Sequence, residues 1–138
     1  MDFRERSERE GERSERRLRV LVIDDDENAR DAVSRFAARQ GTVVVGASTG
    51  LQGIAKAQSE RPDVILLDMM MPGVGGHEVL ARLHGDASTA KIPVIVVTSR
   101  FVNDDERRQI LSRAAAVIDR HDLSHEVVTK AIDSALHR

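Results

Sequence analysis

The chain has 138 residues and a formal net charge of −2, a length that suits one domain. It contains no cysteine, which excludes thiol chemistry. It also contains no tryptophan or tyrosine and only three phenylalanines, so the core must be aliphatic. No apolar stretch approaches a membrane span, the charged N-terminus does not resemble a secretory signal, and the acidic balance argues against nucleic-acid binding. We therefore expect a cytoplasmic protein that binds neither membranes nor nucleic acids.

Residues 1–17 differ in composition from the rest of the chain. They hold six acids and six arginines, and their only large apolar residues are Met1 and Phe3. Because such a segment has little to bury, we expect it to be disordered. The alternative is a solvated helix held by charge pairs such as Glu5 with Arg9, which Gly11 would weaken. We expect residues 18–138 to form the folded domain.

Apolar runs and helical patterns alternate from residue 18 onward. The expected strands cover residues 19–24, 42–47, 64–68, 94–98 and 116–119. The expected helices cover residues 28–40, a segment from residue 48 or 49 to the break at Pro62, residues 76–84, a segment from residue 103 or 104 to 113, and a last helix from Ser124. Gly41 is expected to cap the first helix, and Leu51, Ile54, Ala55 and Gln58 are expected to share one face of the second.

This order is a strand–helix unit repeated five times. Strands of such continuous apolar character need helices on both faces, which predicts an α/β fold with a doubly wound, five-stranded parallel sheet. The crossovers are expected to be right-handed. In such folds ligands bind beyond the carboxyl ends of the strands, so functional residues are expected there.

Polar residues follow the predicted strands at that edge. They are Asp24, Asp25 and Asp26 after the first strand, Asp68 at the end of the third, Thr98 at the end of the fourth, and Asp119 with Arg120 at the end of the fifth. Each one alone has a structural explanation, because acids after a strand commonly cap the next helix. Capping does not explain the acid cluster, the lone aspartate and the hydroxyl together.

Carboxylates crowded at one edge repel one another, so they need a cation to remain ionised together. Oxygen ligands without histidine or cysteine suit Mg²⁺, with Mn²⁺ as a second possibility. A metal and a hydroxyl around one aspartate form a site for phosphoryl transfer, in which the aspartate can become an aspartyl phosphate.

Three segments resemble the receiver domain of two-component response regulators. VLVIDDDENAR is similar to that family's first strand and acidic pair, VILLDMMMPGVGG to its phosphoacceptor strand and loop, and IPVIVVTSR to its fourth strand with a hydroxyl. The resemblance covers residues 18–136 and implies the (βα)5 flavodoxin-like receiver fold. It is most specific in the DMMMPG segment with its following Gly-Gly.

The resemblance implies a role for each matching residue. It makes Asp68 the phosphoacceptor and Thr98 a ligand of a phosphate oxygen. The implied Mg²⁺ ligands are the carboxylates of Asp25 and Asp68, the backbone carbonyl of Met70, and Asp24 through a bound water, with Asp26 as a spectator.

The same resemblance implies a signalling module that is not an enzyme beyond its own phosphorylation and dephosphorylation. The donor would be a phosphohistidine on a histidine kinase or a histidine phosphotransfer protein, and the output would be contacts with another protein. We expect no DNA-binding output domain in this chain. Its ending, DRHDLSHEVVTKAI, also resembles receivers fused to hybrid sensor kinases.

The sequence departs from the family where Lys and usually Pro end the fifth strand, because Arg120 and His121 stand there. Arginine keeps the charge but is longer and forked, so it either reaches the phosphate or pairs with Asp68 and holds the site closed. Without proline we expect a trans Arg120–His121 bond. Val117 replaces the aromatic residue that often reports phosphorylation in this family.

Two further positions are expected to influence the lifetime of the phosphorylated state. In receivers these lie two residues beyond the phosphoacceptor and two beyond the threonine, which here are Met70 and Arg100. Neither side chain can act as a base for an attacking water, so we expect slow self-dephosphorylation.

Two other functions remain open from the sequence. One is a degenerate receiver that is never phosphorylated and acts as a binding module, which Arg120 suggests. The other is a phosphohydrolase of the haloacid dehalogenase type, because Asp24 and Asp26 mimic its nucleophile motif and Thr98 its second motif. That alternative leaves Asp68 and its loop unexplained.

Overall fold

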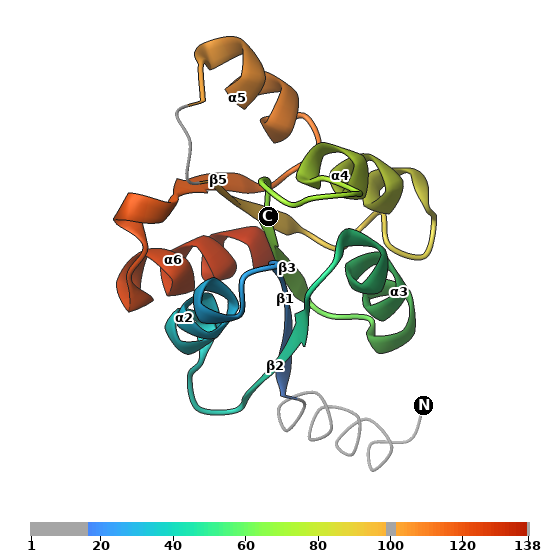
Figure 1. Cartoon of the computed structure of the whole chain (residues 1–138). Coiled ribbons are helices and arrows are strands. Elements are labelled where there is room, and N and C mark those ends of the chain that lie inside the picture. The colour runs from blue at the N-terminus through green and yellow to red at the C-terminus, as the bar shows by residue number, and fades with distance from the viewer. Residues whose placement is uncertain (1–16, 99–101, 138) are drawn as a thin grey trace.

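The computed structural model describes residues 17–98 and 102–137. Within these residues, five strands and five α-helices alternate (Figure 1). The strands are β1 (Leu18–Ile23), β2 (Thr42–Ala47), β3 (Val64–Asp68), β4 (Val94–Thr98) and β5 (Ala116–Asp119). The helices are α2 (Glu27–Ala37), α3 (Gly50–Glu60), α4 (Gly76–Gly85), α5 (Asp104–Leu111) and α6 (His125–Leu136), with a short 3-10 helix, η1 (Arg120–Asp122), after β5.

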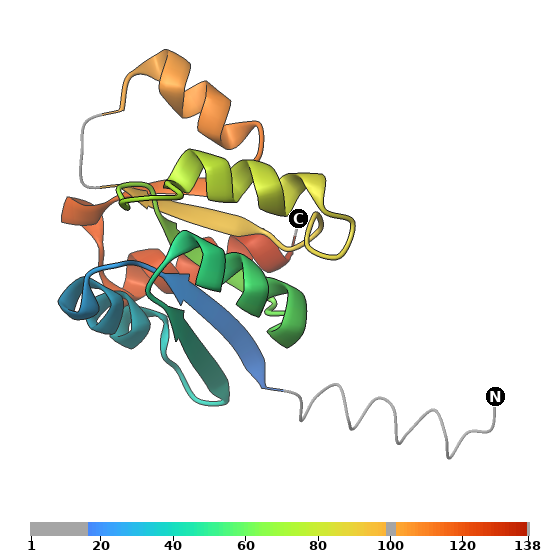
Figure 2. The ribbon, with the colours of Figure 1, turned by 45° about the vertical axis from the view of Figure 1, so that its right-hand side comes forward.

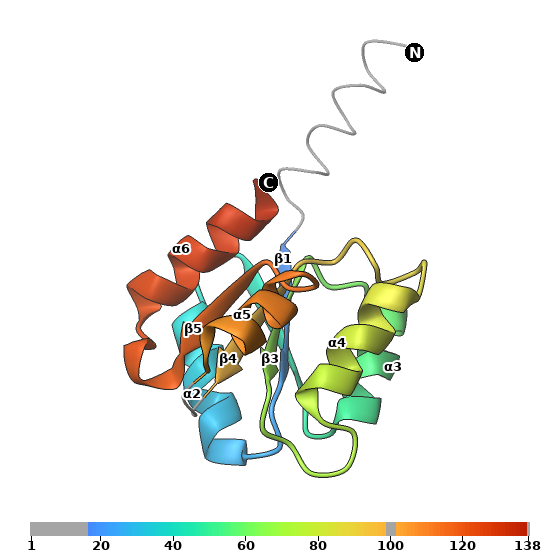
Figure 3. The same cartoon turned by 90° about the horizontal axis from the view of Figure 1, so that it is seen from above.

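All five strands are parallel and lie in the order β2-β1-β3-β4-β5. Helices α2 and α6 cover one face of the sheet, and α3 and α4 lie on the other, which is clearest from above (Figure 3). The predicted doubly wound α/β fold is therefore confirmed. This strand order places β1 and β3 side by side at the centre, so that residues at their carboxyl ends become neighbours.

The core is aliphatic, as the absence of tryptophan and tyrosine requires. The strands β1, β3 and β4 are almost wholly buried, because helices cover both of their faces. Alternate residues of β1 divide between the two layers: Leu21 and Ile23 pack towards α3 and α4, and Val20 and Val22 towards α2 and α6. The sheet is thus a rigid support for the loops at its carboxyl edge.

Side-chain caps begin most of the helices. Thr49 rather than Ser48 caps α3, Asn103 rather than Asp104 caps α5, and Ser124 caps α6 as expected. The prediction for the first helix was wrong at its end: α2 stops at Ala37 with Ala38 as its C-cap. Gly41 instead adopts a positive φ of 82° in the turn that leads into β2.

The face of α3 on which Leu51 and Ile54 were expected is only partly turned to the core, because Ile54 packs against the core and Leu51 does not. Leu51 is 57% exposed, and the buried positions are Gly50, Gly53 and Ala57. A Cβ atom at Gly53 would lie 2.5 Å from Cδ1 of Ile23, so close packing against β1 selects the small residues of the helix for the buried face. Hydrophobicity alone therefore did not identify the buried positions of this helix.

Helix α5 buries fewer of its residues than the other α-helices do. Ile110 is its one buried residue, and the helix lies beyond α4 at the edge of the molecule (Figure 2). His77 Nε2 of α4 lies 3.4 Å from Oε1 of Glu106 and links the two helices. The expected disordered tail falls almost entirely outside the described residues. Among those residues, no helix combines the length and apolar character needed to cross a membrane.

Candidate functional site

Acidic side chains meet at the carboxyl edge of the sheet. Asp24 directly follows β1, and Asp68 is the last residue of the neighbouring strand β3. Both are buried, whereas Asp25 in the same turn as Asp24 is exposed. One carboxylate oxygen from each of the three lies within 4.8 Å of the others. The topology therefore brings together the three carboxylates that the sequence assigned to one site.

These carboxylates fit a small divalent cation. Opposite oxygen ligands of an octahedral Mg²⁺ lie about 4.2 Å apart, twice the Mg–O distance of about 2.1 Å. The three aspartate oxygens all lie within 4.8 Å of one another, so small side-chain movements would bring them to one ion. The set offers oxygen alone, without histidine or cysteine, as hard cations prefer.

Asp26 has a different function from its two neighbours. Its Oδ1 accepts hydrogen bonds from the backbone N–H groups of Asn28 and Ala29, at 2.9 and 3.3 Å, and so caps α2. Its own N–H donates to Oδ1 of Asp24 at 3.0 Å. Capping therefore accounts for one acid of the cluster, and the other two remain available to the site.

Arg120 reaches into the acidic cluster from the end of β5. Its Nη2 lies 3.3 Å from Oδ2 of Asp24 and 3.6 Å from Oδ1 of Asp68. The arginine side chain is 27% exposed, whereas the two aspartate side chains are 3% and 7% exposed. The guanidinium therefore pairs with Asp24 and Asp68, as expected for one of the two geometries that the sequence left open.

Burial raises the pKa of Asp68 from its ordinary 3.8 to about 6. The Met70 N–H and the Arg120 charge both lower this pKa, and the negative charges of Asp24 and Asp25 raise it. Burial and like charge prevail, so the ionised Asp68 is held in an environment that favours its neutral form. A bound cation would oppose that effect.

The loop after β3 forms one wall of the site. The backbone N–H of Met70 donates to Oδ1 of Asp68 at 3.0 Å, which fixes the orientation of that carboxylate. A cavity of about 320 Å³ is lined by Asp24, Asp25, Asp26, Ala29, Asp68, Met70 and Arg120. The Met70 side chain is 51% exposed beside this cavity. The structure therefore supports the expectation that Met70 flanks the Asp68 carboxylate.

Thr98 stands one strand further along the same edge. It is the last residue of β4, is 3% exposed, and is in register with Asp119, the residue before Arg120. It is not among the residues that line the carboxylate cavity. Arg100, the second residue expected to influence phosphate lifetime, lies outside the described residues.

The chain after β5 takes a form that the sequence did not predict in full. The Arg120–His121 bond is trans as expected, because the described residues contain no cis peptide bond. The unpredicted helix η1 begins there, with the Asp119 carboxylate accepting from the N–H of His121 at 2.9 Å. This turn directs the Arg120 side chain towards Asp24 and Asp68. Val117 is half-buried in β5.

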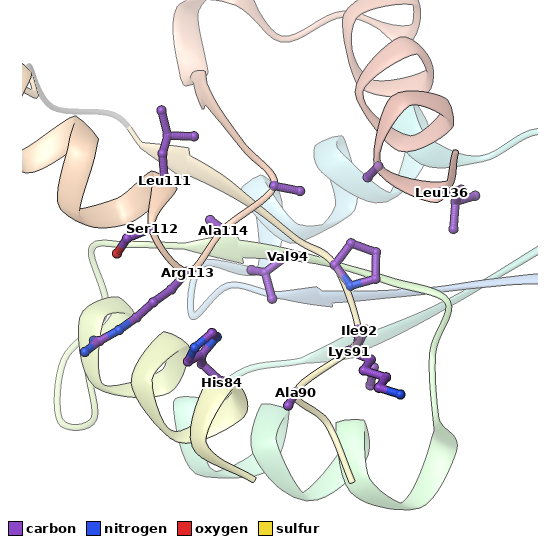
Figure 4. A pocket seen from close by; sticks show the side chains of 13 residues that line it. His84, Ala90, Lys91, Ile92, Val94, Leu111, Ser112, Arg113, Ala114 and Leu136 are labelled. Atoms are coloured by element: carbon purple, nitrogen blue, oxygen red, sulfur yellow. The ribbon is translucent and has the colours of Figure 1, made fainter. Parts of the chain in front are cut away.

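A larger groove of about 500 Å³ lies at the opposite end of the strands (Figure 4). It runs between the ends of α4, α5 and α6, and its lining carries His84, Lys91 and Arg113 with no carboxylate side chain. Cations near helix C-termini have a structural explanation, because they oppose the negative end of the helix dipole. This groove lacks the groups that phosphoryl transfer needs.

The sequence did not single out Arg30, which supports the acidic turn from behind. Its Nη1 donates to the backbone carbonyl of Asp24 at 2.9 Å. An arginine on the first turns of a helix is common on any solvated face, so only the folded arrangement identifies this contact.

Comparison with known proteins assigns the family. The family model described as the response regulator receiver domain matches residues 20–133. Protein PilH of Pseudomonas aeruginosa is 32% identical over 120 residues, which cover 86% of this chain and 97% of PilH. The gliding motility regulatory protein of Myxococcus xanthus is 35% identical over 118 residues, but the match covers 86% of this chain and 15% of that protein.

Solved structures agree with this assignment. The chemotaxis protein CheY4 of Vibrio cholerae has a TM-score of 0.78 at 25% identity, covering 87% of this chain and 99% of CheY4. The response regulator domain of Thermotoga maritima CheB has a TM-score of 0.76 at 27% identity, covering 89% and 98%. The chain therefore belongs to the response regulator receiver family, the signalling modules of two-component systems.

Proposed function

We propose that this receiver is phosphorylated on Asp68 with the help of Mg²⁺. The observation that carries this proposal is the meeting of Asp24, Asp25 and Asp68 within 4.8 Å at the carboxyl edge of β1 and β3. Asp68 is buried and held by the Met70 N–H, so one of its oxygens is fixed while the other can act as nucleophile.

The residues of the chain have separate functions in this step. Asp24, Asp25, Asp68 and the Met70 carbonyl would hold the metal. When bound, Mg²⁺ neutralises charge on the phosphoryl oxygens. An Asp68 oxygen forms a bond to phosphorus while the bond from phosphorus to the imidazole nitrogen of the donor phosphohistidine breaks. Thr98 and Arg120 are proposed to bind oxygens of the phosphoryl group once it is attached.

The donor is proposed to be a histidine kinase or a histidine phosphotransfer protein. The phosphorylated receiver would then signal through contacts with another protein. Family membership and the place of the Asp68 cavity at the edge of the sheet support this proposal.

The test is incubation with Mg²⁺ and acetyl phosphate, followed by intact-mass measurement. We expect a mass increase of one phosphoryl group in the wild type, none without Mg²⁺, and none in Asp68→Asn. Asp133→Asn is a matched control, because this exposed acid on α6 pairs with Arg39 away from the site. No mass increase in the folded wild type would favour the degenerate receiver, in which Arg120 permanently neutralises Asp68.

A further inference from the structure

Arg30 lies behind the acidic turn and contacts its main chain. The side chain starts from α2, is partly buried, and donates from Nη1 to the backbone carbonyl of Asp24 at 2.9 Å. Arg30 is not among the residues that line the carboxylate cavity. Arg30 therefore acts on the site through the backbone.

Gly46 of β2 provides the space for this contact. A Cβ atom at Gly46 would lie 3.1 Å from Cδ and 3.3 Å from Nε of Arg30. Those distances are tighter than ordinary van der Waals contact, so a side chain at this position would require the arginine to shift by a few tenths of an ångström. The position of the Arg30 side chain on α2 therefore depends on the absence of a side chain at Gly46 of β2.

The Asp24 main chain controls where two acidic side chains point. Its N–H donates to the Ala47 carbonyl at 3.0 Å, which holds the N-terminal side of the residue against β2. The contact from Arg30 holds the carbonyl on the other side, in the peptide that joins Asp24 to Asp25. Rotation of that peptide would displace the Asp25 carboxylate relative to Asp68.

We propose that Arg30 is a positioning residue for the divalent-cation site, which fixes the Asp24–Asp25 peptide through the space left by Gly46. This inference rests on the proposed Mg²⁺ site and adds a residue to it. Groups that orient metal ligands from outside the coordination sphere contribute measurably to metal affinity.

Charge and positioning predict opposite results when Arg30 is replaced. If its positive charge were its only influence, removing that charge would strengthen Mg²⁺ binding to the acidic cluster. If Arg30 positions the ligands, Arg30→Met weakens Mg²⁺ binding despite the loss of a repelling cation. The sign of the change therefore identifies the function.

The experiment is a Mg²⁺ titration of the full chain, followed by the backbone amide NMR signals of residues 24–26 and 70. The variants are Arg30→Met, Gly46→Ala and the double variant. Arg35→Met is the matched control, because Arg35 is an exposed arginine on the same helix. Urea unfolding of each variant establishes that it is folded in the titration.

We expect Arg30→Met to raise the Kd for Mg²⁺ about fivefold, the equivalent of one hydrogen bond of ordinary strength. Gly46→Ala is expected to raise it by a smaller factor, and the double variant to resemble Arg30→Met alone, because Gly46→Ala acts by shifting the same arginine that Arg30→Met removes. Arg35→Met is expected to leave the Kd unchanged or slightly lower.

Two results would overturn the inference separately from the proposed function. The first is that the wild type binds Mg²⁺ and Arg30→Met has an unchanged or lower Kd. The second is that the effects of the two substitutions are fully additive. Either result would show that Arg30 does not position the ligands. No Mg²⁺ binding by the wild type would overturn the metal site itself, and the Arg30 inference with it.

Discussion

Arg120 forms an ion pair with Asp68, with 3.6 Å between Nη2 and Oδ1, and so places a guanidinium beside the proposed phosphoacceptor. The same Nη2 lies 3.3 Å from Oδ2 of Asp24. The guanidinium partly neutralises two of the three carboxylates that a metal ion would bind. Resident arginine and incoming Mg²⁺ are therefore expected to compete.

Replacement of Arg120 by methionine is the first prediction. Arg120→Met removes the competing charge and should lower the Kd for Mg²⁺ about fivefold, in line with roughly 1 kcal/mol for a partly buried ion pair. The same variant should accept less phosphoryl from acetyl phosphate, because a proposed ligand of the phosphate is lost. Calorimetric Mg²⁺ titration and intact mass measure the two effects.

The matched control is Arg39→Met, which breaks the ion pair between Arg39, in the segment after α2, and Asp133 of α6. It should change neither measurement. Weaker Mg²⁺ binding in Arg120→Met would contradict competition and would mean that the arginine organises the carboxylates.

The second prediction concerns pH and the stability of the metal-free protein. Because the folded pKa of Asp68 is raised from 3.8 to about 6, the folded state binds a proton more readily than the unfolded state. This contribution to stability is full below about pH 4 and is lost as the pH rises through 6. Its size is about 1 to 3 kcal/mol. Urea unfolding between pH 4 and pH 7 measures it.

Asp68→Asn replaces the carboxylate with a neutral amide of similar shape. This variant should be more stable than the wild type at pH 7, and the difference should shrink towards pH 4. Equal stability of the two proteins at pH 7 would show that the ionised Asp68 is not disfavoured. Mg²⁺ should reduce the difference, because it binds the ionised form.

Asp25→Asn is the third prediction. Asp25 is exposed, so its charge contributes to the metal site with little effect on packing. Loss of one ligand carboxylate should weaken Mg²⁺ binding at least about tenfold, whereas metal-free stability should stay equal or rise slightly as repulsion falls. Asp31→Asn, an exposed acid on α2, controls for net charge. An unchanged Mg²⁺ affinity in Asp25→Asn would remove Asp25 from the site.

Strands were easier to predict from this sequence than helix faces. Five short β-branched runs matched the observed strands closely, because parallel strands buried on both sides leave a continuous apolar signal. The α3 face failed at Leu51, since contact with Ile23 required glycine at position 53 rather than a large apolar residue. Local hydrophobicity does not contain that steric requirement.

Some features of the site could likewise be predicted from the sequence, and others could not. Convergence of Asp24, Asp25 and Asp68 followed from topology alone, because the ends of parallel strands meet at one edge. The cap formed by Asp26 and the support from Arg30 depend on side-chain directions in the turn after β1. The contact of Arg120 with Asp24 depends on η1, which has no apolar pattern to reveal it.

The lifetime of the phosphorylated state is the last prediction. Met70 is half-exposed and lines the Asp68 cavity, so we expect its thioether to obstruct the approach of water, and it cannot act as a base. We expect slow self-dephosphorylation in Mg²⁺, suited to a relay intermediate or a lasting switch.

Met70→Asn supplies an amide that can hydrogen-bond the attacking water, and should speed decay roughly twofold to tenfold. Decay is followed by intact mass after removal of acetyl phosphate. Leu51→Asn, an equally exposed apolar residue outside the cavity lining, should leave the rate unchanged. A wild-type phosphoryl group that is lost rapidly, or a Met70→Asn rate equal to that of the wild type, would show that Met70 does not protect it.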